Sequence, residues 1–446
     1  MKKLKLWGMV GLAAMGIALS GALSGCGSSS DSSSSTSVRL INATLTHSSL
    51  DLWVNAAVAA SDVKTDTAGS YVAPASGTNT LQVNDKGLGT ALATSAVTLA
   101  GGNYYALVAY ESGGTVKTVV LSESLTAPTT ANVTTLRIYD AAIEAGALDV
   151  YVTQLACTSA NLATLSATLS FGTLSAPTSL SVSQGSGAYN VCVTSAGSKT
   201  DLRMSLPITI TGQTVATVVM TPTSGGALIN GALLIQQGTY TAVRNTNSRV
   251  RLAGAVSVQS SGASSVVGAS SSDGTVIDSG SVAPSFGFYA LVPASSSLNV
   301  TVNSATVAVT SGALAAGGDA TLLVYGAPGS ATATLIADDN RPPTSSAATK
   351  LRLINGVTGS TGTLTLTANN SPVGINVASA SASTYQSLVG LTNSAGTAGT
   401  FAFALSSSTA GPLTLPTSSA TGTLNANTAY SILATGTVSA PLLLIR

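Results

Sequence analysis

A six-residue segment with arginine at its second position occurs four times in this 446-residue chain. The copies lie at 38–43, 136–141, 250–255 and 351–356, and their arginines are 98, 114 and 101 residues apart. An apolar closing segment follows each copy, at 104–110, 214–220, 319–325 and 429–435. Self-similarity at a regular period indicates tandem copies of one structural unit. We therefore expect about four units rather than one large core.

Between its opening and closing segments, the first unit contains short stretches with the pattern of β-strands. Residues 50–55 alternate apolar with polar or aromatic side chains, which is the period of a half-buried strand. Further candidate strands at 70–73, 79–84 and 94–99 are separated by proline and glycine turns. Only 7% of residues are charged, and small and β-branched residues favour strands over helices. The pattern predicts an all-β fold of tandem antiparallel, immunoglobulin-like β-sandwich units.

Polar segments at 126–134, 243–248 and 340–349, two of them with proline, separate the units. We expect the units themselves at 38–128, 135–242, 249–340 and 350–446. Joints this short predict a string of separate units with restricted bending, rather than one compact body.

The N-terminus has the layout of a secretory signal. Three lysines lie within the first five residues, residues 6–23 are mainly apolar, and small residues precede Cys26. Residues 23–26, Leu-Ser-Gly-Cys, resemble the bacterial lipobox, in which the cysteine accepts diacylglycerol before cleavage. We expect a signal peptide at 1–25 and a Cys26 that carries palmitate-type acyl chains as a membrane anchor. The alternative is a single transmembrane anchor, which about 18 residues make marginal against the ~20 needed.

Residues 26–37 form the expected link between the lipid and the first unit. Residues 27–37 include eight serines, a composition that buries no apolar surface and behaves as a flexible tether. The residue after the cysteine is Gly27 rather than an aspartate, and this resembles the signal for sorting to the outer membrane. The expected location is therefore the bacterial cell envelope, on the outer membrane, at its periplasmic or surface face.

The first two units resemble an exported repeat of uncharacterised role, the domain of unknown function 4397. The resemblance rests on the opening segments, on Leu-Asp-Leu-Trp-Val-Asn at 50–55 and Leu-Asp-Val-Tyr-Val-Thr at 148–153, and on the closing tyrosines at 105–110. Units 3 and 4 depart from it, because the Leu-Asp strand is degraded at 264–269 and 363–367. The resemblance implies a secreted or lipid-anchored β domain and supplies no activity.

The two remaining cysteines, Cys157 and Cys192, lie 35 residues apart. An exported chain meets an oxidising compartment, so we expect them to form a disulfide. The alternative is a pair of buried thiols.

Groups for catalysis are scarce. His47 is the sole histidine, and the sequence contains no recognised nucleophile, zinc or phosphate-binding motif. A triad of His47 and Asp51 with a serine is a weaker interpretation than a solvated histidine. We expect no catalytic residue, no metal and no cofactor; a calcium site at 338–340 is weighed against a polar linker cluster, which is favoured.

Charge argues against nucleic acid as a partner. The whole chain carries a formal charge of +1, and loss of the three leader lysines leaves the mature chain near −2. Such a chain has no basic field to hold phosphates. The expected partners are the membrane, through the lipid, and a glycan or other envelope proteins.

One candidate ligand face comprises Asp51, Trp53, Asp149 and Tyr151. If the leucines of each Leu-Asp strand point inward, alternation directs the aspartate and aromatic side chains outward. An aromatic ring beside a carboxylate suits a sugar ring and its hydroxyls. The alternative is that these residues protect a sheet edge from aggregation. The four opening arginines are expected to lie over apolar surface or to pair with an aspartate.

The favoured function is a lipid-anchored, non-enzymatic envelope or surface protein that acts as a structural, display or interaction module. The alternative is a carbohydrate or cell-wall binder that uses the candidate ligand face. A degenerate hydrolase is a second alternative, which the lack of acid–base groups disfavours.

Overall fold

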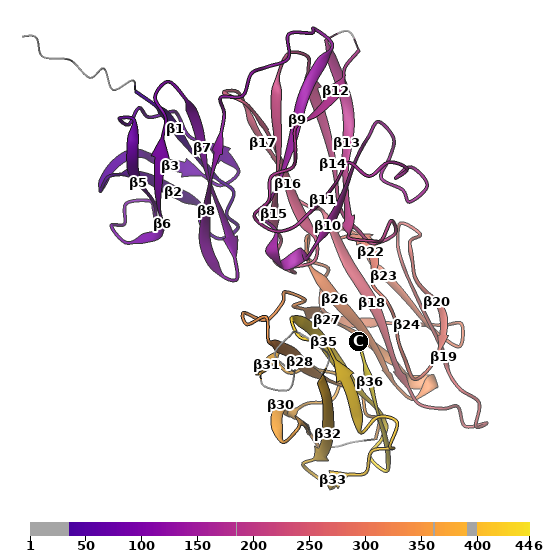
Figure 1. The fold of residues 1–446 in the computed structure, drawn as a ribbon. Coiled ribbons are helices and arrows are strands. Elements are labelled where there is room, and N and C mark those ends of the chain that lie inside the picture. Colours follow the sequence, from indigo (N-terminus) through magenta and orange to yellow (C-terminus); the bar gives the residue numbers. More distant parts are fainter. Residues whose placement is uncertain (1–34, 184, 360–361, 390–398) are drawn as a thin grey trace, which may run out of the picture.

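The computed structural model describes residues 35–183, 185–359, 362–389 and 399–446, so Cys26 and most of the tether lie outside the described residues. The described chain is built from strands and two short 3-10 helices, η1 (Ile143–Ala145) and η2 (Pro328–Ser330). None of its helices is long and apolar enough to cross a membrane. The strands form eight sheets, which assemble in pairs into four β-sandwich units (Figure 1). The predicted all-β fold of tandem sandwiches is therefore confirmed.

Unit 1 consists of two four-stranded sheets, in the orders β4-β1-β7-β8 and β3-β2-β5-β6. Its strands are β1 (Ser37–Asn42), β2 (Ser49–Val54), β3 (Ala57–Lys64), β4 (Thr67–Ala68), β5 (Gly77–Asp85), β6 (Ala91–Leu99), β7 (Tyr104–Ser112) and β8 (Thr115–Ser122). Alternate residues of β1 and β2, such as Leu40 and Leu50, fill the core between the sheets.

Unit 2 consists of sheets in the orders β12-β9-β15-β16-β17 and β11-β10-β13-β14. Its strands are β9 (Val133–Asp140), β10 (Leu148–Thr153), β11 (Ala167–Leu169), β12 (Thr178–Ser181), β13 (Ser186–Ser195), β14 (Leu202–Thr211), β15 (Val215–Pro222), β16 (Ile229–Ile235) and β17 (Tyr240–Val243). Ile138, Val150 and Met220 belong to its core.

Unit 3 consists of one sheet in the order β21-β18-β26-β27-β25, with β22 also paired to β18, and a second in the order β20-β19-β23-β24. Its strands are β18 (Asn247–Val256), β19 (Val266–Ser271), β20 (Val276–Val282), β21 (Ser285–Phe286), β22 (Ala290–Pro293), β23 (Leu298–Val302), β24 (Ala305–Val307), β25 (Val309–Ser311), β26 (Asp319–Gly326) and β27 (Thr332–Asp338).

Unit 4 consists of sheets in the orders β31-β28-β35-β36 and β30-β29-β32-β33, with β34 paired to β32. Its strands are β28 (Ala348–Asn355), β29 (Leu364–Ala368), β30 (Ser371–Val377), β31 (Gln386–Val389), β32 (Gly399–Ser407), β33 (Gly411–Leu413), β34 (Thr421–Leu424), β35 (Thr428–Thr437) and β36 (Ala440–Ile445).

The recurring opening and closing segments pair with each other in every unit, and they pair in parallel. Strand β1 runs parallel to β7, β9 to β15, β18 to β26 and β28 to β35. The sandwiches are thus antiparallel except at this central pair and, in unit 3, where β25 runs parallel to β27. A parallel pair needs a long crossover, and the second sheet of each unit supplies it.

The units are not separate beads, which corrects the expectation drawn from the short joints. One apolar cluster joins Ile41 and Val108 of unit 1 to Tyr139 and Val219 of unit 2. Another joins Ala253 and Leu323 of unit 3 to Ile354 and Leu433 of unit 4. Each cluster lies between the outer faces of two opening–closing sheets. The chain therefore forms two packed pairs of sandwiches, units 1 and 2 and units 3 and 4 (Figure 1).

Candidate functional site

The aspartates of the candidate ligand face do not point to solvent. Asp51 is 4% exposed, and its two carboxylate oxygens accept hydrogen bonds from the main-chain N–H groups of Asp62 and Gly87, both at 2.9 Å. Asp149 is 7% exposed and accepts from the Thr168 hydroxyl at 2.7 Å and the Gly197 N–H at 2.8 Å. Each carboxylate lies on the face opposite the core side chains, as alternation predicts, and ties its strand to neighbouring segments. Because those segments cover it, the expected exposure to solvent is wrong for both aspartates.

The aromatic residues of that face are also enclosed. Trp53 is half-buried, and its ring nitrogen is buried without a hydrogen-bond partner among the described residues. Tyr151 is 4% exposed and packs with Leu162 and Cys192. The loop that contains Leu162 covers the outer face of β10, so strand alternation alone did not predict the burial. These residues form no open platform for a sugar ring.

The predicted disulfide is confirmed. Cys157 and Cys192 are bonded, with their Cα atoms 5.5 Å apart. Cys192 lies opposite Tyr151 in the β10–β13 ladder. The disulfide therefore holds the covering loop against the outer face of unit 2.

In unit 4 a threonine takes the place of the clamping aspartate. In unit 4, Leu364 pairs with Val377 as Leu50 pairs with Val63, which places Thr365 at the position of Asp51. The Thr365 hydroxyl accepts a hydrogen bond from the N–H of Asn376 at 3.1 Å. A threonine in place of an aspartate carries no distinctive signal, so this equivalence was not predicted from the sequence.

His47 does not lie in a triad with Asp51. Its Nδ1 lies 2.6 Å from Oδ1 of Asp85, and its Nε2 lies 3.8 Å from Oε1 of Glu111. That Glu111 oxygen also accepts hydrogen bonds from the N–H and hydroxyl of Thr46. No hydroxyl bonds to the imidazole within the described ranges, so the geometry offers no activated nucleophile there.

The two aspartates of the candidate calcium site already pair with arginine and lysine side chains of the protein. Asp338 has a fully buried side chain that accepts hydrogen bonds from Tyr289 and Thr321 and pairs with Arg352. Burial works against ionisation of the neighbouring Asp339, but hydrogen bonds from Arg341 and Lys350 lower its pKa to about 2. No group of three potential metal ligands occurs in the described part of the chain.

The four opening arginines are buried where units meet. Arg39 forms a two-pronged pair with Glu123 and donates to the Gly238 carbonyl of unit 2 at 2.6 Å. Arg137 reciprocates by donating to the Ser122 carbonyl of unit 1 at 3.0 Å. Of the two alternatives expected for these arginines, pairing with an aspartate is confirmed for Arg251 and Arg352, which both face Asp338, whereas Arg39 pairs with a glutamate.

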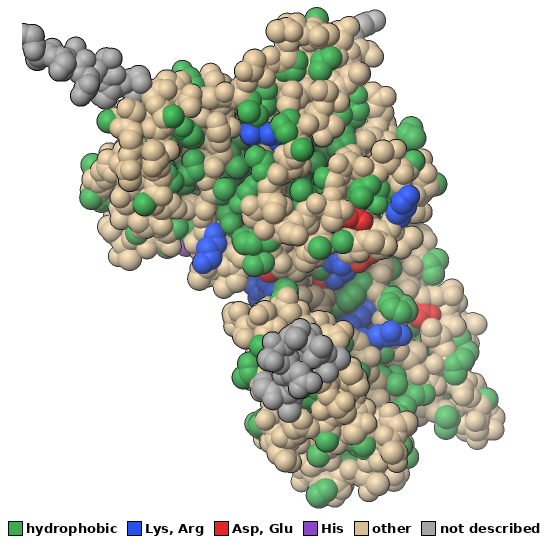
Figure 2. Space-filling model, viewed as in Figure 1, with side chains coloured by type: hydrophobic (Ala, Val, Ile, Leu, Met, Phe, Trp, Pro, Cys, Tyr) green, Lys and Arg blue, Asp and Glu red, His purple; other side chains and the backbone are tan. Residues whose placement is uncertain are grey.

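The second pair of units repeats this exchange. Arg251 donates to the Ser431 hydroxyl of unit 4 at 2.8 Å, and Arg352 donates to the Ala337 carbonyl of unit 3 at 2.7 Å. Both arginines also face Asp338, and burial lowers the pKa of each guanidinium. In Figure 2 many of the visible Lys, Arg, Asp and Glu side chains lie near the middle of the molecule, whereas most of the remaining visible surface is uncharged.

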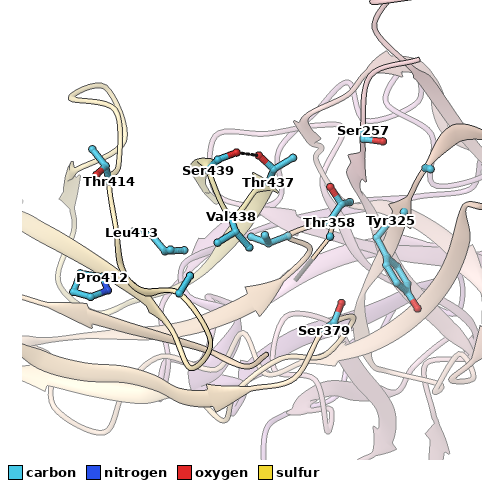
Figure 3. Close-up of a pocket in the computed structure, with 15 residues that line it drawn as sticks. Ser257, Tyr325, Thr358, Ser379, Pro412, Leu413, Thr414, Thr437, Val438 and Ser439 are labelled. Atoms are coloured by element: carbon cyan, nitrogen blue, oxygen red, sulfur yellow. Dashed lines mark hydrogen bonds between the residues drawn. The ribbon is translucent and has the colours of Figure 1, made fainter. Parts of the chain in front are cut away.

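An open groove of about 870 Å³ lies between units 3 and 4 (Figure 3). Tyr325, at the end of β26, and Ser257 form one side, and Pro412 and Leu413 of β33 form the opposite side. The β35–β36 turn, with Val438, lies between them. The volume is within the range of sites for small ligands.

The groove is polar but uncharged. Hydroxyl side chains line it together with the apolar groups, and none of its described lining residues carries a charge: the hydroxyls come from Ser257, Thr358, Ser379, Thr414, Thr437 and Ser439. The hydroxyls of Thr437 and Ser439 form a hydrogen bond at 3.1 Å. The phenolic hydroxyl of Tyr325 has no hydrogen-bond partner among the described residues. The arrangement can offer donors, acceptors and one partly exposed ring to a neutral polar ligand.

Residues 36–151 match the family model of a domain of unknown function (DUF4397). The match covers unit 1 and reaches into β10 of unit 2, which confirms the resemblance seen in the opening and Leu-Asp strands. No curated protein matches the chain. One matching solved structure comes from a study of alpha-glucan recognition by family 41 carbohydrate-binding modules from streptococcal virulence factors. The match has 11% identity, covers 43% of this chain and 95% of that chain, and has a TM-score of 0.16, which supports no inference here.

Proposed function

We propose that this chain is a lipid-anchored, non-enzymatic protein of the bacterial cell envelope. Its described body acts as a stiff structural or display module held off the bilayer by the serine-rich tether. The observation that carries the proposal is the exchange of buried arginine contacts between paired units. Because these arginine side chains are buried where the units meet and contact the neighbouring unit in both directions, each pair of units resists bending more than a flexible string of domains would.

The same observation supports a role without catalysis. Charged groups such as Arg39, Glu123 and Asp338 are buried and bonded to other side chains of the protein. Groups committed in this way are not free to transfer protons to a substrate. The low mature charge supports partners other than nucleic acid, namely the membrane through the lipid and other envelope components.

The anchor is tested with Cys26→Ala. Cells that express the full chain are labelled with palmitate and fractionated, and Ser28→Ala serves as the control in the tether. We expect Cys26→Ala to lose the label and leave the membrane fraction, while Ser28→Ala retains both. Undiminished labelling of Cys26→Ala would exclude the anchor. Protease treatment of intact cells then distinguishes the surface face of the outer membrane from the periplasmic face.

Binding of a neutral glycan in the groove between units 3 and 4 is a second candidate function. The candidate glycan site is now this groove, because the face formed by Asp51, Trp53, Asp149 and Tyr151 is covered. The hydroxyl-rich, uncharged lining of the groove supports glycan binding. A glycan array probed with the detergent-solubilised full chain tests it. We expect Tyr325→Ala to lose binding, whereas Phe288→Ala, which removes a ring exposed outside the groove, retains it. Equal binding by the Tyr325 variant and the unsubstituted chain would contradict the groove as the site.

A further inference from the structure

A second cavity, of about 420 Å³, lies where units 1, 2 and 4 meet the joint between units 3 and 4. The β7–β8 hairpin of unit 1 contributes Ser112, Thr115 and Lys117, and helix η1 of unit 2 contributes Glu144. The joint contributes residues 342–344 and 346, and unit 4 contributes Asn427. Segments more than 300 residues apart in the sequence thus form one enclosure, which a single unit could not provide.

Glu144 is a buried carboxylate with one oxygen unused. The residue is 8% exposed, and its Oε1 accepts a hydrogen bond from the N–H of Gly113 at 2.7 Å. Its Oε2 is buried and has no hydrogen-bond partner among the described residues. The nearby Arg341 does not satisfy this oxygen, since its guanidinium pairs with Asp339 at 2.7 and 2.9 Å. A buried anionic oxygen without a partner is unfavourable, which marks a position where a donor is missing.

Lys117 brings the opposite charge to the same cavity. It lies on β8 opposite Tyr110 and is exposed. It forms no ion pair with any described residue, including Glu144 across the cavity. One carboxylate and one ammonium group, each without an ionic partner, therefore line a single enclosure.

The remaining lining is neutral and suits a small polar ligand. Ser112, Thr115, Thr344, Ser346 and Asn427 offer hydroxyl and amide groups. Ile143, Pro342 and Pro343 supply apolar contact surface. The combination fits an aliphatic group between two charged ends. An isolated anion would face Glu144, and an isolated cation would leave Lys117 unpaired.

We propose that this cavity binds a zwitterionic amino acid, either free or as a dipeptide. The ligand's ammonium group pairs with Glu144, its carboxylate pairs with Lys117, and its side chain contacts the prolines. Such a ligand joins units 1 and 2 to the joint that precedes unit 4. Because it binds only when these parts are assembled, it raises the temperature at which they separate.

The test uses isothermal calorimetry on the detergent-solubilised full chain. The probes are L-alanine, L-leucine and L-lysine, each with its carboxamide, which lacks the carboxylate, and its N-acetyl derivative, which lacks the ammonium group. Alanyl-alanine and leucyl-alanine distinguish a dipeptide from a free amino acid. The variants are Glu144→Gln, which keeps an acceptor for Gly113, and Lys117→Met, with Lys199→Met as a control at an exposed lysine elsewhere in unit 2.

We expect at least one zwitterion to bind tenfold or more tightly than both of its derivatives, because each loses one charge-assisted contact. Lys117→Met then binds the zwitterion and its carboxamide equally, and Glu144→Gln binds the zwitterion and its N-acetyl derivative equally. Lys199→Met behaves as the unsubstituted chain does. The proposal is overturned if no probe binds at millimolar concentration, if zwitterions and derivatives bind alike, or if Lys199→Met weakens binding as much as Lys117→Met. Lys117→Met changes an exposed residue, so the result does not depend on the folding of the Glu144 variant.

Discussion

Replacement of Asp338 by asparagine is expected to destabilise the pair formed by units 3 and 4 strongly. Its carboxylate has no exposed surface and faces two guanidinium groups, those of Arg251 and Arg352, which are 4% and 2% exposed. It also accepts a hydrogen bond from the Thr321 hydroxyl at 2.7 Å. Asp338→Asn keeps the shape of the side chain but leaves two buried cations without their anion.

The expected size follows from that burial. Removal of one partner from a buried ion pair costs about 3–5 kcal/mol, because the remaining charge stays desolvated and uncompensated. For a unit of about 100 residues the urea dependence of the free energy of unfolding is roughly 1–1.5 kcal/mol per molar, so the unfolding midpoint falls by about 2–5 M. Asp339→Asn is the matched control. Its side chain is 34% exposed and pairs with the half-exposed Arg341 and with the buried Lys350. Because the Lys350 ammonium group keeps the carbonyls of Asp339 and Arg341 as acceptors, loss of the Asp339 charge costs about 1–2 kcal/mol, less than loss of the Asp338 charge.

Two spectroscopic probes assign the effect to the correct units. Trp53 is the sole tryptophan outside the leader, so its fluorescence follows unit 1, whereas far-ultraviolet circular dichroism follows all four units. We expect Asp338→Asn to shift part of the dichroism transition and to leave the Trp53 transition in place. Equal shifts for the Asp338 and Asp339 variants would refute the reasoning. So would a fall in the wild-type midpoint on addition of a calcium chelator, which would restore the calcium interpretation of residues 338–340.

Three further predictions concern the interfaces and the clamp. Gly356→Ala is expected to cost about 1–3 kcal/mol in units 3 and 4, because the new Cβ would lie 2.6 Å from Cβ of Ala255; Gly329→Ala, with open space around it, should be neutral in the same urea titration. Burial raises the pKa of Asp140 to about 6 from 3.8, so the folded state keeps this proton up to higher pH than the unfolded chain does. The free energy of unfolding should therefore fall by on the order of 2–3 kcal/mol as pH rises from about 4 to 6, and thermal melts of Asp140→Asn should lack this component. Asp51→Ala is expected to lower the Trp53 unfolding midpoint by an amount equivalent to about 1–3 kcal/mol while glycan-array binding is unchanged, and loss of a glycan signal would restore Asp51 as a ligand residue.

The sequence predicted the repeated architecture well because that information is local. Strand alternation and turn residues depend on near neighbours in the sequence, and the repeat is found by comparing short segments with one another. The disulfide follows from the expected compartment and the number of cysteines. The burial of Asp51 could not be predicted in the same way. The β2–β3 ladder has a register shift between Leu50 and Leu52, and Asp62 at that irregularity has a φ of 64°. This local departure from the strand pattern directs the Asp62 N–H toward the carboxylate.

The burial of Tyr151 also depended on a segment distant from its strand. A loop held by the disulfide covers the outer face of β10. Alternation within a strand predicts which face a side chain lies on, but not whether another segment of the chain covers that face. The cavity with Glu144 and Lys117 is a stronger case of the same limit. Its walls come from three units and a joint, so no single stretch of sequence contains the pattern.

The opening segment did carry a sign of the paired units. In Val-Arg-Leu-Ile-Asn-Ala, Leu40 enters the core of its own sandwich, whereas Ile41 and Ala43 lie in the cluster shared with unit 2. An exposed sheet face would alternate apolar with polar residues, but this strand has apolar residues on both faces, and Arg39 and Asn42 are its only polar residues. A strand with two apolar faces must be covered on both, and a single two-layer sandwich covers only one. A second copy of the same unit supplies the other cover. The arginine at the second position is satisfied there by carbonyls and hydroxyls of the neighbouring unit, which explains why one segment recurs in all four units although their other strands diverge.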